Sequence, residues 1–99
     1  MEKYSINGTP NTPDINFDLS SGILSISGRS IPENSIEFYN PLFSALETYF
    51  TNPKEKTTLN IQLEYYNSSS SACLLSVFKK LEKFKKTKGI LQKIIISFT

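Results

Sequence analysis

The sequence contains no histidine and a single cysteine, and these scarcities exclude several kinds of site. Without histidine there is no Ser-His-Asp or Cys-His nucleophile and no imidazole ligand for a transition metal. Cys73 alone can form neither an internal disulfide nor a structural zinc site. The nine carboxylates show no metal-binding or hydrolase spacing. We therefore predict no catalytic residues, no metal and no cofactor, and a protein that is not an enzyme.

Long apolar runs are also missing. The longest run of large aliphatic residues is Ile94-Ile95-Ile96, far shorter than a membrane span. The first residues contain no apolar stretch typical of a signal peptide. The length of 99 residues fits one domain, and 38% hydrophobic residues with seven Phe and five Tyr are typical of a globular one. We expect a single cytoplasmic domain, residues 1–99, with no membrane partner.

The charges are distributed unevenly along the chain. Residues 79–99 carry seven lysines against one acidic residue, Glu82. Such lysines can bind nucleic acid, but no aromatic residues interleave with them on the exposed face of the helix to stack on bases. Cations near the C-terminal end of a helix are also favoured by its dipole. We therefore prefer a solvated helix face, and keep as an alternative function a small basic module that binds nucleic acid or an anionic ligand through its Lys-rich second helix.

Alternation of polar and apolar residues predicts four strands. They lie near residues 14–19, 23–27, 58–66 and 92–98. Ser20-Ser21-Gly22 predicts the turn of a hairpin between the first two strands. Residues 3–13 contain two prolines and a glycine, which indicates an extended strap that crosses the surface or adds an edge strand.

Helical spacing of apolar residues predicts two helices, near 41–51 and 70–87. Asn34 and Glu37 have the spacing of a capping box, but Pro41 interrupts the first helix. Either a short turn ends before it and the main helix restarts at this proline, or one helix is kinked there. We favour the restart because proline is well tolerated in a first turn.

The order of elements predicts the fold class. Strands joined through a helix are normally parallel. Strands that are covered on both faces have continuous apolar runs, whereas the predicted strands alternate polar and apolar residues. We therefore predict a two-layer α/β sandwich in which a mixed β-sheet carries its helices mainly on one face. An N-terminal β-hairpin leads into a β-α-β-α-β type order.

A run of four serines, Ser68–Ser71, follows Asn67 where a strand ends and the second helix begins. Capping of the helix alone would account for these residue types. A phosphate on Ser68 would also meet free backbone N–H groups and the positive end of the helix dipole, worth roughly 0.3–2 kcal/mol. The position is therefore suited to modification without unfolding.

Four segments of the sequence resemble the SiaC family of bacterial regulatory phosphoproteins. The segments are Gly8-Thr9-Pro10-Asn11-Thr12-Pro13, residues 22–30, Ile31-Pro32-Glu33-Asn34-Ser35 and Leu63-Glu64-Tyr65-Tyr66-Asn67-Ser68-Ser69-Ser70. They span nearly the whole chain in the family's order. The positions that carry the family motif are Gly8, Thr9, Thr12, Pro13, Pro32, Glu33, Asn34 and Ser35.

The resemblance implies a fold akin to the STAS domains of anti-sigma-factor antagonists. It also implies a phosphoacceptor after Asn67, which falls on Ser68 with Ser69 as the second choice, and with Tyr66 and Ser70 in its surroundings. In the family a dedicated kinase phosphorylates this residue and a PP2C-type phosphatase dephosphorylates it.

The unmodified form of the best-known family member binds and activates a diguanylate cyclase. By this resemblance we expect a regulatory adaptor of a partner-switching pathway, monomeric when free, that controls a downstream target protein. Because family members continue past the last strand into a further helix, we expect this chain, which stops at Thr99, to lack that helix.

Overall fold

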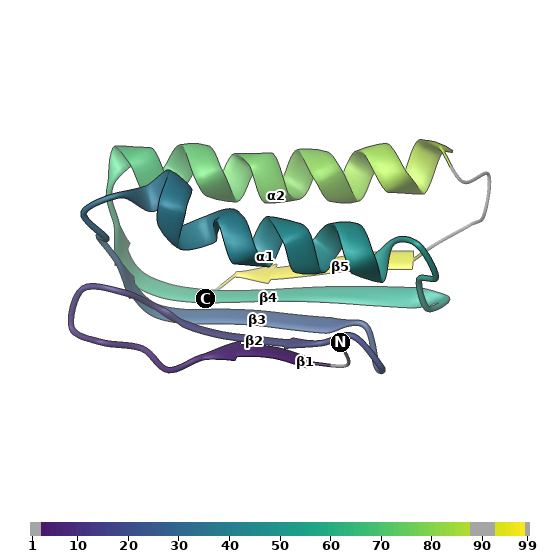
Figure 1. Ribbon diagram of the computed structural model, residues 1–99, viewed down its shortest axis with the longest axis horizontal. Coiled ribbons are helices and arrows are strands. Elements are labelled where there is room, and N and C mark those ends of the chain that lie inside the picture. The colour runs from purple at the N-terminus through teal and green to yellow at the C-terminus, as the bar shows by residue number, and fades with distance from the viewer. Residues whose placement is uncertain (1–2, 88–92, 99) are drawn as a thin grey trace.

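Within residues 3–87 and 93–98, which this computed structural model describes (with side chains for residues 3–83), five strands form one sheet and two helices cover one of its faces (Figure 1). The strands are β1 (Lys3–Ile6), β2 (Asp14–Asp18), β3 (Ile23–Ser30), β4 (Lys56–Tyr66) and β5 (Lys93–Phe98). The helices are α1 (Ser35–Tyr49) and α2 (Ser68–Thr87). The strands lie in the sheet in chain order.

The sheet is mixed, as predicted. β1 pairs with β2, and β2 with β3, in antiparallel directions, whereas β3–β4 and β4–β5 are parallel and each is connected through a helix. The predicted hairpin turn is confirmed, since Asp18 pairs with Ile23 and the chain turns back at Gly22 with φ +74°. Of the two interpretations of the strap, the edge strand is correct because β1 extends the sheet beyond β2.

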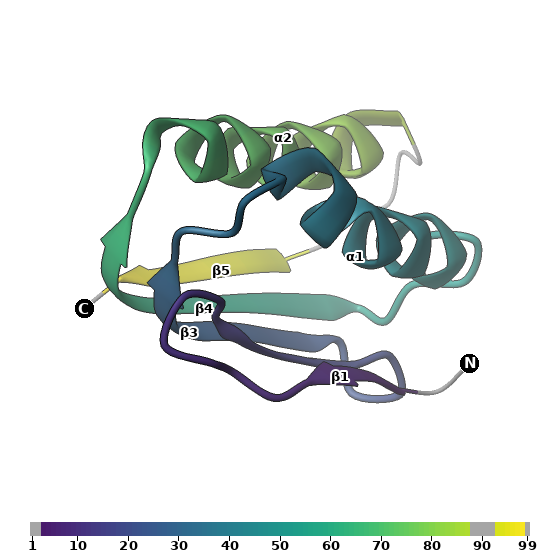
Figure 2. The same cartoon turned by 60° about the vertical axis from the view of Figure 1, so that its left-hand side comes forward.

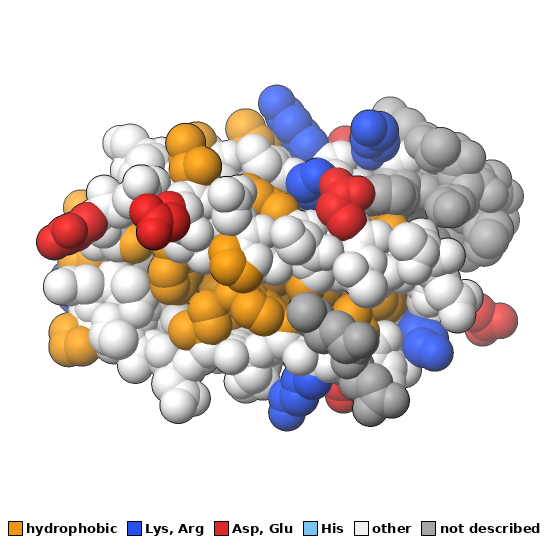
Figure 3. Space-filling view, viewed as in Figure 1, with side chains coloured by type: hydrophobic (Ala, Val, Ile, Leu, Met, Phe, Trp, Pro, Cys, Tyr) orange, Lys and Arg blue, Asp and Glu red, His pale blue; other side chains and the backbone are white. Residues whose placement is uncertain are grey.

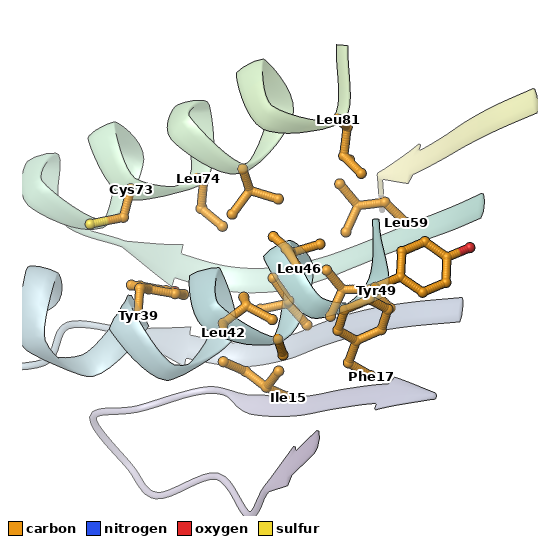
Figure 4. Close-up of a cluster of buried hydrophobic side chains, with 14 of the residues drawn as sticks. Ile15, Phe17, Tyr39, Leu42, Leu46, Tyr49, Leu59, Cys73, Leu74 and Leu81 are labelled. Atoms are coloured by element: carbon orange, nitrogen blue, oxygen red, sulfur yellow. The ribbon is translucent and has the colours of Figure 1, made fainter. Parts of the chain in front are cut away.

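Both helices lie side by side over the same face of the sheet and enclose the core with it (Figure 2). The core combines alternate residues of β2, β3 and β4 with the apolar faces of α1 and α2 (Figure 4). Its largest fully buried side chains include Ile15, Phe17, Leu24, Ile26, Tyr39, Leu42, Leu46, Phe50, Leu59 and Val77. In the described side chains of β2–β4 the other face is mostly polar, with Asn16 and Gln62 exposed beside Ile23. The two-layer arrangement with helices on one face is therefore confirmed.

The core is covered less completely beside β1. The four-residue strand contributes Tyr4 and Ile6, which are half-buried against the core, as is Phe38 of α1. Apolar side chains consequently remain visible between α1 and the β1 edge (Figure 3). A short edge strand thus completes the sheet without sealing this side of the core.

The first helix begins at Ser35, so the prediction of a helix that restarts at residue 41 is wrong. Asn34 is its N-cap, and the Asn34 side chain accepts a hydrogen bond from the Glu37 N–H over 3.1 Å. Pro41 lies inside this one helix, where it lacks the N–H that would reach the Glu37 carbonyl. Pro41 and Glu37 are both exposed, so water can take the place of the missing donor.

The second helix begins at Ser68, two residues before the predicted start, because Asn67 rather than a serine caps it. Its buried face contains Leu74, Val77 and Leu81, as the apolar spacing predicted. The expected C-cap, Gly89, lies outside the described residues. In the described part of the chain, neither helix has the length and apolar character that a membrane-spanning helix needs.

An ion pair joins the exposed sides of the two helices. The Lys80 ammonium on α2 lies 2.6 Å from a Glu47 carboxylate oxygen on α1 and 5.9 Å from the centre of the Phe43 ring. The hydrogen bond from Lys80, and then its charge, lower the pKa of Glu47. A carboxyl group whose pKa is lowered by folding stabilises the folded state above its ordinary pKa, and this contribution is lost as the pH falls through the lowered value.

We therefore expect Glu47→Gln to cause a small fall in Tm at neutral pH and low salt, since exposed ion pairs contribute little. Thermal melts of both proteins at neutral and strongly acidic pH check this, because the difference should vanish in acid and in high salt. A difference that persists under those conditions would mean that Glu47 contributes through packing rather than charge.

Candidate functional site

The serine run Ser68–Ser71 lies at the end of the sheet where β3 and β4 end and both helices begin (Figure 2). The Asn67 N–H donates to the Ser30 carbonyl over 3.1 Å and ties the start of α2 to the last residue of β3. The Ile31 N–H donates to the Asn11 carbonyl over 2.8 Å, which brings the loop between β1 and β2 to the same end. Segments far apart in the sequence thus converge around the serine run.

Asn67 is the N-cap of α2. Its Oδ1 accepts from the Ser70 N–H over 2.9 Å, and its carbonyl accepts the first helical hydrogen bond, from the Ser71 N–H, over 3.0 Å. An asparagine that leaves the strand in this way satisfies a backbone donor that the helix cannot satisfy itself. The serines are therefore the first residues of the helix and not its cap.

Ser70 is fully buried and belongs to a network of hydroxyl groups. Its Oγ donates to the Ser30 carbonyl over 2.9 Å and accepts from the Ser30 Oγ over 2.8 Å. The Tyr39 phenol lies 2.6 Å from the Ser30 Oγ, whose proton is already used, so the phenol is the donor there. Burial raises the pKa of Tyr39, which keeps this donor protonated. Ser70 is thereby fixed to β3 and α1.

Ser69 is held by the start of α1. Its Oγ lies 2.8 Å from the Oγ of Ser35, the first residue of α1, which is only 3% exposed. The Ser69 Oγ in turn donates to the Asn67 Oδ1 over 3.2 Å, so Ser35 is the donor of the first bond. We call Ser30, Ser35, Tyr39, Ser69 and Ser70 the hydroxyl network.

Ser68 stands apart from this network. It is the first residue of α2, it is exposed, and within the described residues its hydroxyl makes no hydrogen bond to protein. Tyr66, just before the cap, is 51% exposed. Of the two candidate acceptors from the sequence, Ser68 is thus the one with a free hydroxyl, and Ser69 is the one held in the hydroxyl network.

The family-motif residues before β2 shape their own loop. Thr9 Oγ1 accepts from the Thr12 N–H over 3.0 Å, and the two threonine hydroxyls lie 2.7 Å apart. The Gly8 N–H donates to the Asp14 carboxylate, and Pro13 is buried. Among the described residues, none of these positions hydrogen bonds to the serine run. Their contribution is to fold the loop that reaches the site's edge through Asn11.

The motif residues before α1 include one that reaches the serine run. Pro32 is buried, Glu33 is exposed, and Asn34 caps α1. Ser35 is the residue of this group that contacts the serine run, through Ser69 and, over 3.4 Å, through the Oγ of Ser70. Ser35 therefore contacts two serines that lie 34 and 35 positions later in the sequence.

Sequence reasoning missed two members of the hydroxyl network, Ser30 and Tyr39. The apolar spacing of the first helix includes Tyr39, and nothing in that spacing distinguishes a phenol that only packs from one that also donates a hydrogen bond. Ser30 lies beyond the predicted end of its strand. In both cases the contact partners are known only once the fold brings them together.

An apolar groove of about 380 Å³ adjoins the serine run. It is lined by Ile61, Leu63, Tyr66, Ser71, Leu74, Leu75 and Phe78. Within the described residues, β5 pairs with β4 only as far as Ile61, so the groove lies where β4 continues without a neighbour on that side. Tyr66 and Leu75 are each 51% exposed there, which places accessible apolar surface beside Ser68.

The lysine-rich end of α2 is partly accounted for by contacts within the protein. Lys80 is paired with Glu47, while Lys79 and Lys83 are exposed. The lysines at positions 85, 86, 88 and 93 lie outside the described side chains. No group of three or more potential metal-ligating residues occurs among the described side chains. The solvated helix face stays the prediction, and the basic face as a binding site stays the alternative.

Comparison with known proteins identifies the family of the chain. The sequence pattern of the SiaC family of regulatory phosphoproteins matches residues 6–96, which include the entire site. The chain belongs to the SiaC family. An uncharacterized protein of Pseudomonas aeruginosa (strain UCBPP-PA14) is 32% identical over 83 residues, which are 84% of this chain and 66% of that relative. The chain thus spans 66% of the length of this curated relative.

Solved structures of SiaC share the fold. The crystal structure of apo-SiaC from Pseudomonas aeruginosa superposes with a TM-score of 0.89 at 28% identity, over 99% of this chain and 78% of that one. A chain from the crystal structure of the diguanylate cyclase SiaD in complex with its activator SiaC, from the same organism, gives a TM-score of 0.76 at 23% identity, over 97% and 99%. The fold class is therefore confirmed, while the likeness to STAS domains stays a prediction.

Proposed function

We propose that this SiaC-family chain is a single regulatory domain that is switched by phosphorylation of Ser68 and acts by binding a target protein rather than by catalysis. The observation that carries the proposal is the exposed Ser68 hydroxyl at the first residue of α2, which has no hydrogen-bond partner among the described residues. The family to which the chain belongs is one of regulatory phosphoproteins, which supports a phosphoacceptor in this region.

The position of Ser68 suits a modification that changes binding and not folding. A phosphate there meets the N-terminal end of α2, where helix N–H groups and the helix dipole favour negative charge by roughly 0.3–2 kcal/mol. The hydroxyl network holds the start of α2 through Ser69 and Ser70 and does not involve Ser68. Phosphorylation can therefore leave the fold intact.

The target surface that we propose is the end of the molecule around Ser68. Tyr66 and Leu75 expose apolar surface beside the groove, and such surface is typical of a protein-binding site. SiaC of Pseudomonas aeruginosa is the activator of the diguanylate cyclase SiaD and forms a complex with it. By analogy we propose a diguanylate cyclase as the target, with a dedicated kinase and a PP2C-type phosphatase acting on Ser68 in the cytoplasm.

The test is the intact mass of the chain isolated from its own host, followed by mapping of the modified peptide. We expect a species heavier by one phosphoryl group, modified on Ser68, and little of any phosphorylated species for Ser68→Ala. Treatment with a PP2C-type phosphatase should remove the added mass. A parent protein that never carries phosphate under conditions where the kinase is produced would contradict the proposal, and Ser44→Ala, at an exposed serine on α1, is the matched control.

A further inference from the structure

Four serines in succession offer a kinase four hydroxyl groups within about one helical turn. Their hydroxyl groups differ in the contacts that they make with the start of α1. We propose that Ser35, at the buried start of α1, confines phosphorylation to Ser68 by holding the hydroxyl of Ser69. Ser35 is then a positioning residue that selects the acceptor from 33 positions away in the sequence. This inference rests on the phosphorylation proposed above and specifies how its site is chosen.

Phosphoryl transfer sets what an acceptor hydroxyl must supply. The serine oxygen forms a bond to the γ-phosphorus of ATP, the bond from that phosphorus to ADP breaks, and the hydroxyl proton passes to the catalytic base of the kinase. The acceptor therefore needs both an available lone pair and a transferable proton. A hydroxyl already engaged as donor and acceptor within its own protein must give up those bonds first.

Ser69 is engaged in both ways. Its proton is donated to the Asn67 Oδ1 over 3.2 Å, and its oxygen accepts from Ser35 over 2.8 Å. Because Ser35 is 3% exposed at the first residue of α1, water competes little for its hydroxyl, and the Ser70 Oγ is a more distant acceptor at 3.4 Å. One net hydrogen bond of ordinary strength lowers the population of the free hydroxyl by about fivefold. Ser35 therefore lowers the availability of Ser69 even though this serine is exposed.

The other two serines are withheld by different means. Ser70 is fully buried, with its hydroxyl bonded to both the carbonyl and the Oγ of Ser30. Ser71 is exposed, but its N–H donates the first helical hydrogen bond to the Asn67 carbonyl over 3.0 Å. If Ser71 left the helix to enter the active site of a kinase, that hydrogen bond would break. The N–H of the first residue of a helix makes no such bond, so Ser68 loses none. Ser68 is consequently the residue that can be presented at the lowest cost.

The experiment compares the occupancy of each serine by phosphopeptide mapping of the protein isolated from its own host. The forms are the parent, Ser68→Ala, Ser35→Ala/Ser68→Ala and, as control, Ile36→Ala/Ser68→Ala, which alters the neighbouring and 69% exposed Ile36. We expect phosphate on Ser68 in the parent and little in Ser68→Ala. The Ser35 double variant should gain phosphate on Ser69, about fivefold above Ser68→Ala, while the Ile36 control stays at the level of Ser68→Ala.

The conservative double variant Ser35→Thr/Ser68→Ala, which keeps a hydroxyl at position 35, should return Ser69 to the low level. Equal occupancy of Ser69 with and without Ser35→Ala, or none in either, would overturn the inference while leaving the phosphorylation of Ser68 in place. Phosphate that appears on Ser70 as well as Ser69 would also overturn it, because general loosening of the helix start exposes both. A parent without phosphate on any of the four serines would instead refute the proposed function itself.

Discussion

Gly22→Ala is expected to lower the free energy of unfolding by about 2–5 kcal/mol, because backbone strain and steric overlap add at this turn. Gly22 has φ +74°, and a Cβ there would lie 2.5 Å from the Tyr49 phenol oxygen and 2.7 Å from the Lys56 carbonyl oxygen. The phenol cannot move aside cheaply, since it lies 2.8 Å from the Thr57 hydroxyl and accepts from the Lys54 N–H over 3.2 Å. A Cβ at this hairpin turn would therefore overlap both with the end of α1 and with the start of β4.

Chemical and thermal unfolding measure this effect, with a fall in Tm of at least about 8 °C expected for a domain of this size. Gly28→Ala is the comparison. Gly28 also has a positive φ of +105°, but the nearest atom to a Cβ there would be the Pro13 Cα, 3.8 Å away. That variant bears the backbone strain without the overlap and should lose less. An equal fall in the free energy of unfolding for the two variants would show that the close contacts around Gly22 do not contribute to the effect.

Strands β2, β3 and β4 follow from the sequence because each buries mainly one face. In β2, the buried residues Ile15 and Phe17 alternate with exposed Asp14 and Asn16, so the alternation in the sequence is the burial pattern itself. The end of β3 was missed because Gly28 interrupts the alternation, and the pairing with β4 shifts register there before it continues to Ser30. A strand can tolerate such an irregularity when its neighbours hold it, and no local pattern reveals this.

The start of α1 shows how two local signals compete. Asn34 with Glu37 indicated a helix start at 35, and Pro41 indicated one at 41. The cap prevailed because Tyr39 and Leu42, on either side of the proline, are both fully buried in the core. Their burial compensates for the one hydrogen bond that proline removes. Tertiary packing decided between signals that the sequence weighs almost equally.

The candidate site could be predicted in position but not in its connections. The change from strand to helix, with Asn67 and four serines, placed Ser68 at a helix N-terminus, and the structure has it there. The hydroxyl network joins Ser30 to Ser70 and Ser35 to Ser69, pairs separated by 40 and 34 residues. Serine is common at helix starts for capping alone, so the sequence does not indicate which of these hydroxyls are bonded to one another.

Ser68→Asp is expected to weaken binding of the proposed target, a diguanylate cyclase of the same host, by more than a hundredfold. When the target covers the end of α2, a neutral hydroxyl is desolvated at little cost, whereas phosphoserine carries about −1.5 to −2 charges. The helix N-terminus offsets part of this charge while the site is wet. Burial of an unmatched anion under a partner still costs several kcal/mol, and about 3 kcal/mol already exceeds a hundredfold in Kd.

Titration calorimetry of the purified proteins gives the affinities, and Ser68→Ala should bind as tightly as the parent. Ser44→Asp adds the same charge at an exposed position in the middle of α1 and should leave binding unchanged. The Tm of Ser68→Asp should lie close to that of the parent, because an acidic residue in the first turn of α2 is favoured by the helix dipole and Asn67 still caps the helix. If Ser68→Asp and Ser68→Ala bind the target equally well, negative charge at the start of α2 does not control binding and the switch lies elsewhere.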